Sequence, residues 1–202
     1  MAAVNRKQRA LQTRERIASA AARLFAERGY DGVPMDAIAA EAGVAVQTVY
    51  FAFRTKPELL IAAWDQAVLG SLAAPPPDQQ EWFLAVLDEP DPRATLRLMV
   101  DGVLAILERI GPLMPVMMSA PDPGVRAEYE RREQLRYAGW RAVVDSLGKP
   151  HLKGGLTIAT ASDVFFALLS PAMHHVLCTT RGWSNKQYRS WVLATVEAQL
   201  LR

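Results

Sequence analysis

The chain has 202 residues, half of them hydrophobic, and a formal net charge of +2, which is enough for a substantial core in one or two globular domains. Cys178 is the only cysteine, so an intrachain disulfide is excluded, and a reducing cytoplasm is the expected compartment. Because the N-terminal residues lack an apolar signal-peptide core and no run approaches the roughly 18 apolar residues of a membrane span, we expect neither secretion nor membrane insertion.

Basic residues are concentrated at the front of the chain. Residues 1–60 hold nine Lys or Arg against six Asp or Glu, whereas the remainder holds fourteen against fifteen. Six of these nine basic residues fall within the first 23, where Glu15 is the only acidic residue. This distribution favours a basic arm beside a polyanion such as nucleic acid, and a short solvated tail has the same composition.

Apolar residues recur at helical spacing along nearly the whole chain, and no alternating pattern bounded by hairpin turns is present. The sequence therefore predicts an all-α fold. The expected helices cover residues 13–28, 35–42, 45–52, 57–72, 81–87, 92–110, 112–119, 125–147, 156–180 and 184–201. Thr13 is the expected N-cap of the first helix. Three consecutive prolines make the segment 73–78 a stiff loop.

Two short expected helices, around residues 35–42 and 45–52, meet the requirements of a helix-turn-helix. Crossing helices need a small residue where their backbones meet, a turn residue that tolerates a left-handed conformation, and an apolar anchor. Ala39, Gly43 and Val49 supply these three in that order. With Val49 turned inward, the outer or N-terminal side of the third helix carries Val46, Gln47, Thr48 and Tyr50. Such side chains can meet a major groove; the alternative is a packing module in which Tyr50 is a half-buried surface aromatic.

Five nearly continuous segments carry a family pattern, namely YDGV at 30–33, MDAIA at 35–39, EAGV at 41–44, TVYFAF at 48–53 and KPELL at 56–60. Through them, residues 13–64 resemble the N-terminal domain of the tetracycline-repressor (TetR) family. The resemblance implies that Thr48 and Tyr50 contact the DNA backbone or bases and that Lys56 holds a phosphate. It assigns base reading to Val46 and Gln47.

Three positions depart from the family pattern. Pro34 stands where a Thr often caps the second helix, and Ala45 stands where a Ser usually caps the third. Ala52 replaces a His or Tyr that often approaches a phosphate. Each departure removes a hydrogen-bonding group, so we expect a lower DNA affinity or a greater dependence on the basic arm.

The rest of the chain is similar to the family's regulatory domain in helix count and general pattern. We therefore place a helix-turn-helix DNA-binding domain with a basic N-terminal arm at residues 1–56, and a helical domain for ligand binding and dimerisation at residues 57–202. Candidate pocket residues are Trp82, Met99, Val103, Met117, Trp140 and Phe166. Methionine and aromatic side chains suit an adaptable pocket for an apolar or aromatic small molecule, and they suit an ordinary core equally well.

The last two expected helices carry apolar groups on more than one side. Candidate dimer contacts are Leu168, Val176, Trp191, Val192 and Val196. By resemblance, these helices form a four-helix interface that aligns the two DNA-binding domains of a homodimer with successive major grooves. A palindromic operator in double-stranded DNA follows from that symmetry.

Other classes of function have weaker support. His174 and Cys178 share a helix face and could form a metal or thiol-sensing pair, but a third ligand is missing and a buried core pair is the alternative. No phosphate-binding loop, zinc-type cysteine cluster or nucleophile motif is present. We therefore expect no catalysis, no metal and no cofactor, and leave a helical-bundle enzyme or a DNA-silent binding module as alternatives. The prediction is a cytoplasmic, ligand-responsive repressor released from its operator by a small, largely apolar effector.

Overall fold

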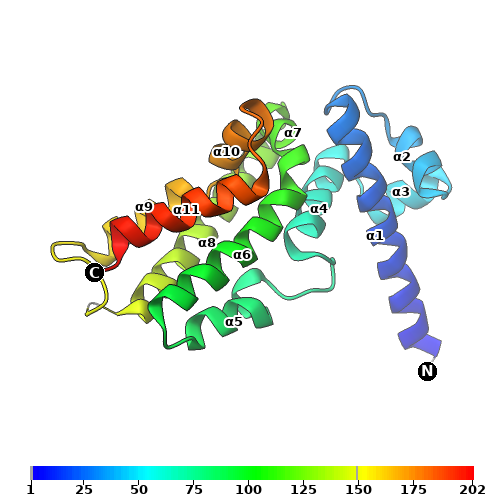
Figure 1. The fold of residues 1–202 in the computed structure, drawn as a ribbon. Coiled ribbons are helices and arrows are strands. Elements are labelled where there is room, and N and C mark those ends of the chain that lie inside the picture. The colour runs from blue at the N-terminus through cyan, green and yellow to red at the C-terminus, as the bar shows by residue number, and fades with distance from the viewer. Residues whose placement is uncertain (1, 149) are drawn as a thin grey trace. The chain divides into compact units, whose positions relative to one another are not determined.

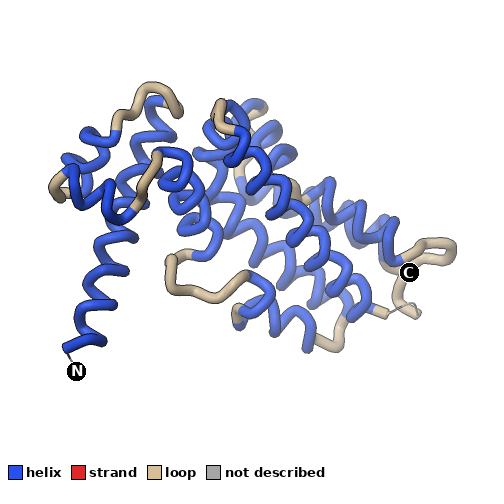
Figure 2. The backbone as a smooth tube through the Cα atoms, turned by 180° about the vertical axis from the view of Figure 1, so that it is seen from behind, coloured by secondary structure: helices blue, strands red, loops and turns tan. Residues whose placement is uncertain are grey.

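The computed structural model describes residues 2–148 and 150–202, and these residues form helices joined by loops, without a named strand (Figures 1 and 2). The all-α prediction is confirmed. The helices are α1 (Ala2–Arg28), α2 (Met35–Ala42), α3 (Val46–Ala52), α4 (Lys56–Leu69), α5 (Glu81–Asp88), α6 (Pro92–Ile110), α7 (Met114–Ser119), α8 (Pro123–Leu147), α9 (Ile158–Leu168), α10 (Pro171–His174) and α11 (Asn185–Leu200). Two 3₁₀ turns, Pro77–Gln79 and Gly111–Leu113, and a π-helical segment, His175–Thr180, complete the list.

The chain divides into two compact units. The first contains the residues up to Ala74 together with Pro112–Tyr129, and the second contains Pro75–Gly111 and Glu130–Arg202. The division between a DNA-binding domain at 1–56 and a regulatory domain at 57–202 stays a prediction about function.

Helix α1 begins eleven residues earlier than the sequence indicated. Thr13 lies inside the helix, so its prediction as the N-cap is wrong. The physical reason is that residues 2–12 contain neither Gly nor Pro and several good helix formers, so the helix continues toward the N-terminus.

The core of the first unit is the one expected from the helical periodicity of α1. Ile17, Ala21, Leu24 and Phe25 are buried on one side of that helix, which packs against α2 and α4. Phe53 and Leu59 are fully buried as well. The three helices before α4 are therefore closed by α4 into one small bundle.

The helix expected over 156–180 is interrupted in the structure. Ser170 caps a new helix by accepting a 3.1 Å hydrogen bond from the Met173 backbone N–H, and Pro171 occupies the first position of α10. Proline at that position lacks only an N–H that would be unpaired anyway, so the start of α10 is stable there. The π-helical segment follows directly.

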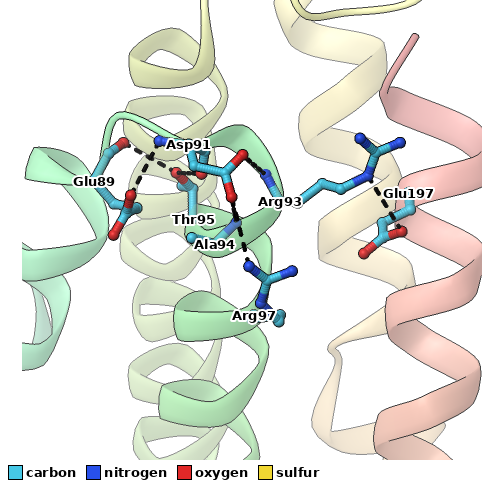
Figure 3. A network of polar contacts seen from close by, with 7 residues as sticks. All are labelled: Glu89, Asp91, Arg93, Ala94, Thr95, Arg97 and Glu197. Carbon is cyan, nitrogen blue, oxygen red and sulfur yellow. Dashed lines mark hydrogen bonds and ion pairs between the residues drawn. The ribbon is translucent and has the colours of Figure 1, made fainter.

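Helix α6 forms the centre of the second unit, where it packs against α5, α10 and α11. Its buried face includes Leu96, Val100 and Leu107. Figure 3 shows how its first turn is held: the Asp91 carboxylate accepts from the backbone N–H of Ala94 at 3.1 Å, and the Thr95 hydroxyl donates to the Asp91 carbonyl at 3.0 Å. The first bond satisfies a backbone donor that a helix start otherwise leaves unpaired, and the second gives the buried Thr95 hydroxyl a partner.

By composition alone, Pro92–Ser119 and Ile158–Thr180 are long and apolar enough to cross a membrane. In α6, however, the apolar residues form the stripe that packs against other helices of the second unit. Core helices pass the same test of composition, so these two segments do not indicate a membrane protein.

Gly102 gives a test of the packing of α5 on α6. A Cβ atom built there would lie 2.2 Å from Cε3 of Trp82, whereas one at Gly139, inside α8, would meet Phe83 no closer than 3.8 Å. Both glycines are within helices, where alanine is normally better by about 0.5 to 1 kcal/mol. We expect Gly102→Ala to destabilise the protein by about 1 to 3 kcal/mol through overpacking, and Gly139→Ala to leave stability unchanged or raise it. Urea denaturation measures both, and equal effects would contradict the contact.

Candidate functional site

The helix-turn-helix has the geometry that the sequence predicted. Gly43 ends α2 in the left-handed region, with φ of 64° and ψ of 41°, and the backbone N–H of Val44 donates to the carbonyl of Ala39 at 3.0 Å. Ala39 is buried at the crossing of α2 and α3, and Val49 is fully buried as the anchor of α3. The small residue, the turn residue and the anchor thus occupy their predicted places.

The predicted reading residues lie on the exposed part of α3. Gln47 and Tyr50 are exposed, and Val46 and Thr48 are half-buried. Their placement away from the buried side of Val49 agrees with the helical step used in the prediction. Contact with DNA by these four side chains stays a prediction.

Phe51 was missed by the sequence interpretation. Its side chain is 92% exposed, the largest exposure among the large hydrophobic residues described as exposed. The signal was present in the sequence, because a residue two positions after a buried anchor points to the opposite side of a helix. Phe51 therefore belongs to the outer surface of α3.

Arg14 contacts the C-terminal end of α3. One guanidinium nitrogen donates to the carbonyl oxygen of Ala52, and the guanidinium lies 4.2 Å from the centre of the Phe53 ring. A cation is favourable at a helix C-terminus, where carbonyl groups lack partners. Arg14 is therefore a positioning residue for α3 on α1, whereas the sequence interpretation counted it among the charges of the basic arm.

Lys56 is held at the start of α4. Its ammonium lies 4.5 Å from the centre of the Tyr30 ring, which in turn stacks on Phe25 with the ring centres 5.8 Å apart. Burial lowers the pKa of Lys56, and the nearby Asp31 carboxylate opposes that shift. The cation–π contact restricts the side chain and fixes its charge close to the first turn of α4.

The turn between α3 and α4 is closed by a reciprocal cap. The Thr55 hydroxyl accepts from the Glu58 backbone N–H at 3.2 Å, and the Glu58 carboxylate accepts from the Arg54 backbone N–H at 3.1 Å. By contrast, Pro34 and Ala45 make no side-chain cap for α2 and α3. The expected loss of two side-chain caps is confirmed. Side-chain contacts near α3 are found instead at its C-terminal end and at the start of α4.

Polar contacts also join α1 to the far end of α4. The Glu15 carboxylate accepts from the Ser71 hydroxyl and, at 3.1 Å, from the backbone N–H of Leu72. One turn further along α1, the Ser19 hydroxyl accepts from the Gln66 side-chain amide of α4 at 2.9 Å. Glu15 is thus occupied within the first unit and does not simply offset the basic residues around it.

The predicted pocket residues are distributed over both units. Met117 belongs to the first unit, and the other five belong to the second. Met99, Val103, Met117 and Trp140 are buried, and Trp82 and Phe166 are half-buried. Within the second unit Trp140 stacks on Phe165 with the ring centres 5.4 Å apart, and its buried indole Nε1 has no hydrogen-bond partner there. A ligand-binding role for these residues stays a prediction.

A cavity of about 420 Å³ lies elsewhere, in the first unit. It is lined by Thr55, Pro57, Glu58, Ile61, Asp122, Gly124 and Glu128. None of these is a predicted pocket residue, and three of the seven are acidic. The Asp122 carboxylate is itself occupied, because it accepts from the Gly124 backbone N–H at 2.8 Å at the start of α8.

The predicted dimer residues differ in their exposure. Val176 is exposed, and Leu168 and Trp191 are half-buried, so these three can contribute to an intermolecular surface. Val192 and Val196 are fully buried within the chain. They face the core of the second unit, so Leu168, Val176 and Trp191 remain as the candidates for the predicted interface.

His174 and Cys178 are accounted for by packing. Nε2 of His174 lies 2.9 Å from the Asn185 side-chain oxygen, and its ring meets the Tyr188 ring edge-on at 5.1 Å. Burial, with a smaller contribution from Glu108, raises the pKa of the Cys178 thiol and so disfavours the reactive thiolate. Among the described residues, no group of three or more His, Cys, Asp or Glu is placed to hold a metal ion.

Comparison with known proteins adds to this geometry. Residues 17–63, from the core of α1 into α4, match the family model of bacterial regulatory proteins, tetR family. This match places the helix-turn-helix part of the chain in the TetR family. The matched model describes bacterial regulatory proteins, and the matched residues are those that form the helix-turn-helix. No protein among those with curated descriptions matches the chain.

Solved structures of transcriptional regulators match nearly the full length of the chain. NalD of Pseudomonas aeruginosa, a repressor of a multidrug efflux pump, has 23% identity over 95% of this chain and 96% of its own, with a TM-score of 0.70. FadR of Bacillus subtilis in complex with stearoyl-CoA has 16% identity over 90% and 96%, with a TM-score of 0.72. A regulator of Saccharomonospora viridis in complex with choline has 21% identity over 95% and 98%, with a TM-score of 0.74. At these identities the similarity shows the fold.

Proposed function

We propose that this TetR-family regulator is a cytoplasmic, homodimeric repressor that binds a palindromic operator through α3. The observation that carries the proposal is the reading surface of α3, which exposes Gln47 and Tyr50 while Val49 anchors the helix in the core. Arg14 contacts the C-terminal end of α3, and Lys56 at the start of α4 packs on the Tyr30 ring. A pre-positioned helix with polar and aromatic side chains suits contact with a major groove.

Substitution in this surface tests the proposal. Lys56→Ala should weaken binding to all operator sequences and lower the slope of log affinity against log salt by about one, because one phosphate contact is lost. Tyr50→Ala should also weaken all sites, whereas Gln47→Ala should change the preference among bases. Fluorescence anisotropy with promoter-region DNA, over a range of salt, separates these effects. Unchanged binding by the Tyr50 and Lys56 variants would refute the assignment.

The proposed dimer uses the exposed side of the last helices. Trp191 is half-buried in α11 next to the fully buried Val192, so one side of this helix faces the core while the other remains accessible. A charged residue at Trp191 should yield monomers that bind half-sites weakly. Analytical ultracentrifugation reports the change, and a fully dimeric variant with full operator affinity would place the interface elsewhere.

The proposed effector is a small, largely apolar molecule that binds near Met99, Val103, Trp140 and Phe166 in the second unit. Support comes from the apolar and aromatic character of these residues, and from solved TetR-like relatives that hold stearoyl-CoA or choline. If the effector releases the operator, ligand and DNA must weaken each other by the same factor, about 5- to 150-fold for a coupling of about 1 to 3 kcal/mol. Titration of a candidate ligand into free and operator-bound protein tests this, and equal affinities would exclude it as an effector.

A further inference from the structure

The reading helix α3 has no charged side chain. Its seven residues include neither an acidic nor a basic one. The commonest specific contact to a guanine in the major groove is a bidentate pair from Arg or Lys, and α3 lacks the groups that make it. Arg54 follows only after the C-cap, Phe53, so it lies beyond the helix.

The outermost ridge of α3 consists of an amide and an apolar ring. Gln47 and Phe51 are four residues apart and so share one face of the helix. At 100° per residue they lie about 160° from Val49 on either side, opposite the buried anchor. Phe51 is 92% exposed and the adjacent Tyr50 is 51% exposed, so neither ring is buried in the core.

We propose that Phe51 reads thymine methyl groups next to an adenine bound by Gln47, so that the half-site facing α3 consists of A·T pairs. The inference rests on the proposed DNA-binding function and names its sequence preference. A glutamine amide pairs with the N6 and N7 positions of adenine, and the only apolar group in the major groove is the thymine methyl. The hydroxyls of Thr48 and Tyr50 remain for the backbone.

The test starts from DNA that the full-length protein selects itself. A random duplex library is enriched by binding, and each thymine of the selected half-site is then replaced by deoxyuridine, which lacks only the methyl group. For the unaltered protein we expect A·T pairs at the enriched core positions and a loss of about fourfold in affinity for each contacted methyl that is removed. Phe51→Ala should weaken binding to the intact operator by at least the same factor and should no longer distinguish thymine from deoxyuridine.

Two further variants control the experiment. Leu84→Ala removes a 46% exposed leucine of α5 in the second unit and should keep both the affinity and the fourfold sensitivity. Gln47→Ala should relax the adenine preference and keep the sensitivity to deoxyuridine. A half-site with guanines at the core positions, or a Phe51→Ala variant as sensitive to deoxyuridine as the unaltered protein, would overturn the inference. Failure to enrich any duplex would instead overturn the proposed DNA-binding function, and this inference with it.

Discussion

Replacing Phe53 by alanine is expected to lower the free energy of unfolding by about 3 to 5 kcal/mol and to abolish operator binding. The ring is fully buried, and the Arg14 guanidinium lies over it at 4.2 Å. The Phe53 backbone also ends α3, donating to the Val49 carbonyl at 2.7 Å. Removal of the ring leaves a cavity and frees Arg14 at the end of the reading helix. Because domains are stable by only about 5 to 15 kcal/mol, the loss is a large share of the total.

Phe51 supplies a matched control for this prediction. Phe51→Ala removes the same side chain two positions earlier, but that ring is 92% exposed. A surface change of this kind should alter stability by no more than about 0.5 kcal/mol. Guanidinium denaturation followed by circular dichroism compares the two variants directly, and similar losses in both would show that Phe53 does not anchor the reading helix.

Alkaline pH should lower the stability of the protein through Tyr188. Its side chain is fully buried, and its hydroxyl donates to the Leu168 carbonyl, which ties α11 to α9. Burial, and to a lesser extent the charge of a Cys178 thiolate, raises the pKa of Tyr188 far above its usual value near 10. The neutral form is therefore the folded form. Its contribution is complete below pH 10 and is lost as the pH rises toward the folded pKa, at about 1.4 kcal/mol for each pH unit.

The difference in stability between the Tyr188→Phe variant and the unaltered protein should change sign as the pH rises. At pH 7 the variant lacks the bond to Leu168 and should be less stable by about 0.5 to 1.5 kcal/mol. Near pH 12 it should be the more stable protein, because it has no phenol to ionise. Urea titrations at a series of pH values measure this crossing, with Tyr50→Phe, an exposed tyrosine, as the control. Parallel curves for the variant and the unaltered protein would show that ionisation of Tyr188 is not the cause.

The helix-turn-helix could be predicted because its determinants are local. Ala39, Gly43 and Val49 each follow from a requirement within fifteen residues of chain, and the helical step from Val49 then places the exposed side chains. The same step would have identified Phe51, but an apolar ring was not considered for an outward position. The local pattern was therefore sufficient to place Phe51 on the surface, and the residue was missed only in the interpretation of that pattern.

Other features depend on packing between distant residues. Arg14 was interpreted from its charge, whereas its contacts with Ala52 and Phe53 arise only when α1 folds against α3. Val192 lies on a helix with apolar residues on several sides, and periodicity does not decide which side faces the core. The break at Ser170 was readable as a cap followed by proline. It was missed because the apolar pattern runs through it on both sides.

The early start of α1 changes how the basic N-terminus can meet a polyanion. As a helix, the eleven residues from Ala2 to Gln12 span about 16 Å, less than half of the roughly 36 Å that the same residues would cover as an extended arm. Arg6 and Arg9 are exposed and one turn apart, so they form a pair with a fixed spacing. Their ordering entropy is already lost in the free protein, and association therefore requires no folding of this segment. We therefore expect this helical segment, whose reach is set by the helical rise, to contact only phosphates close to the first unit.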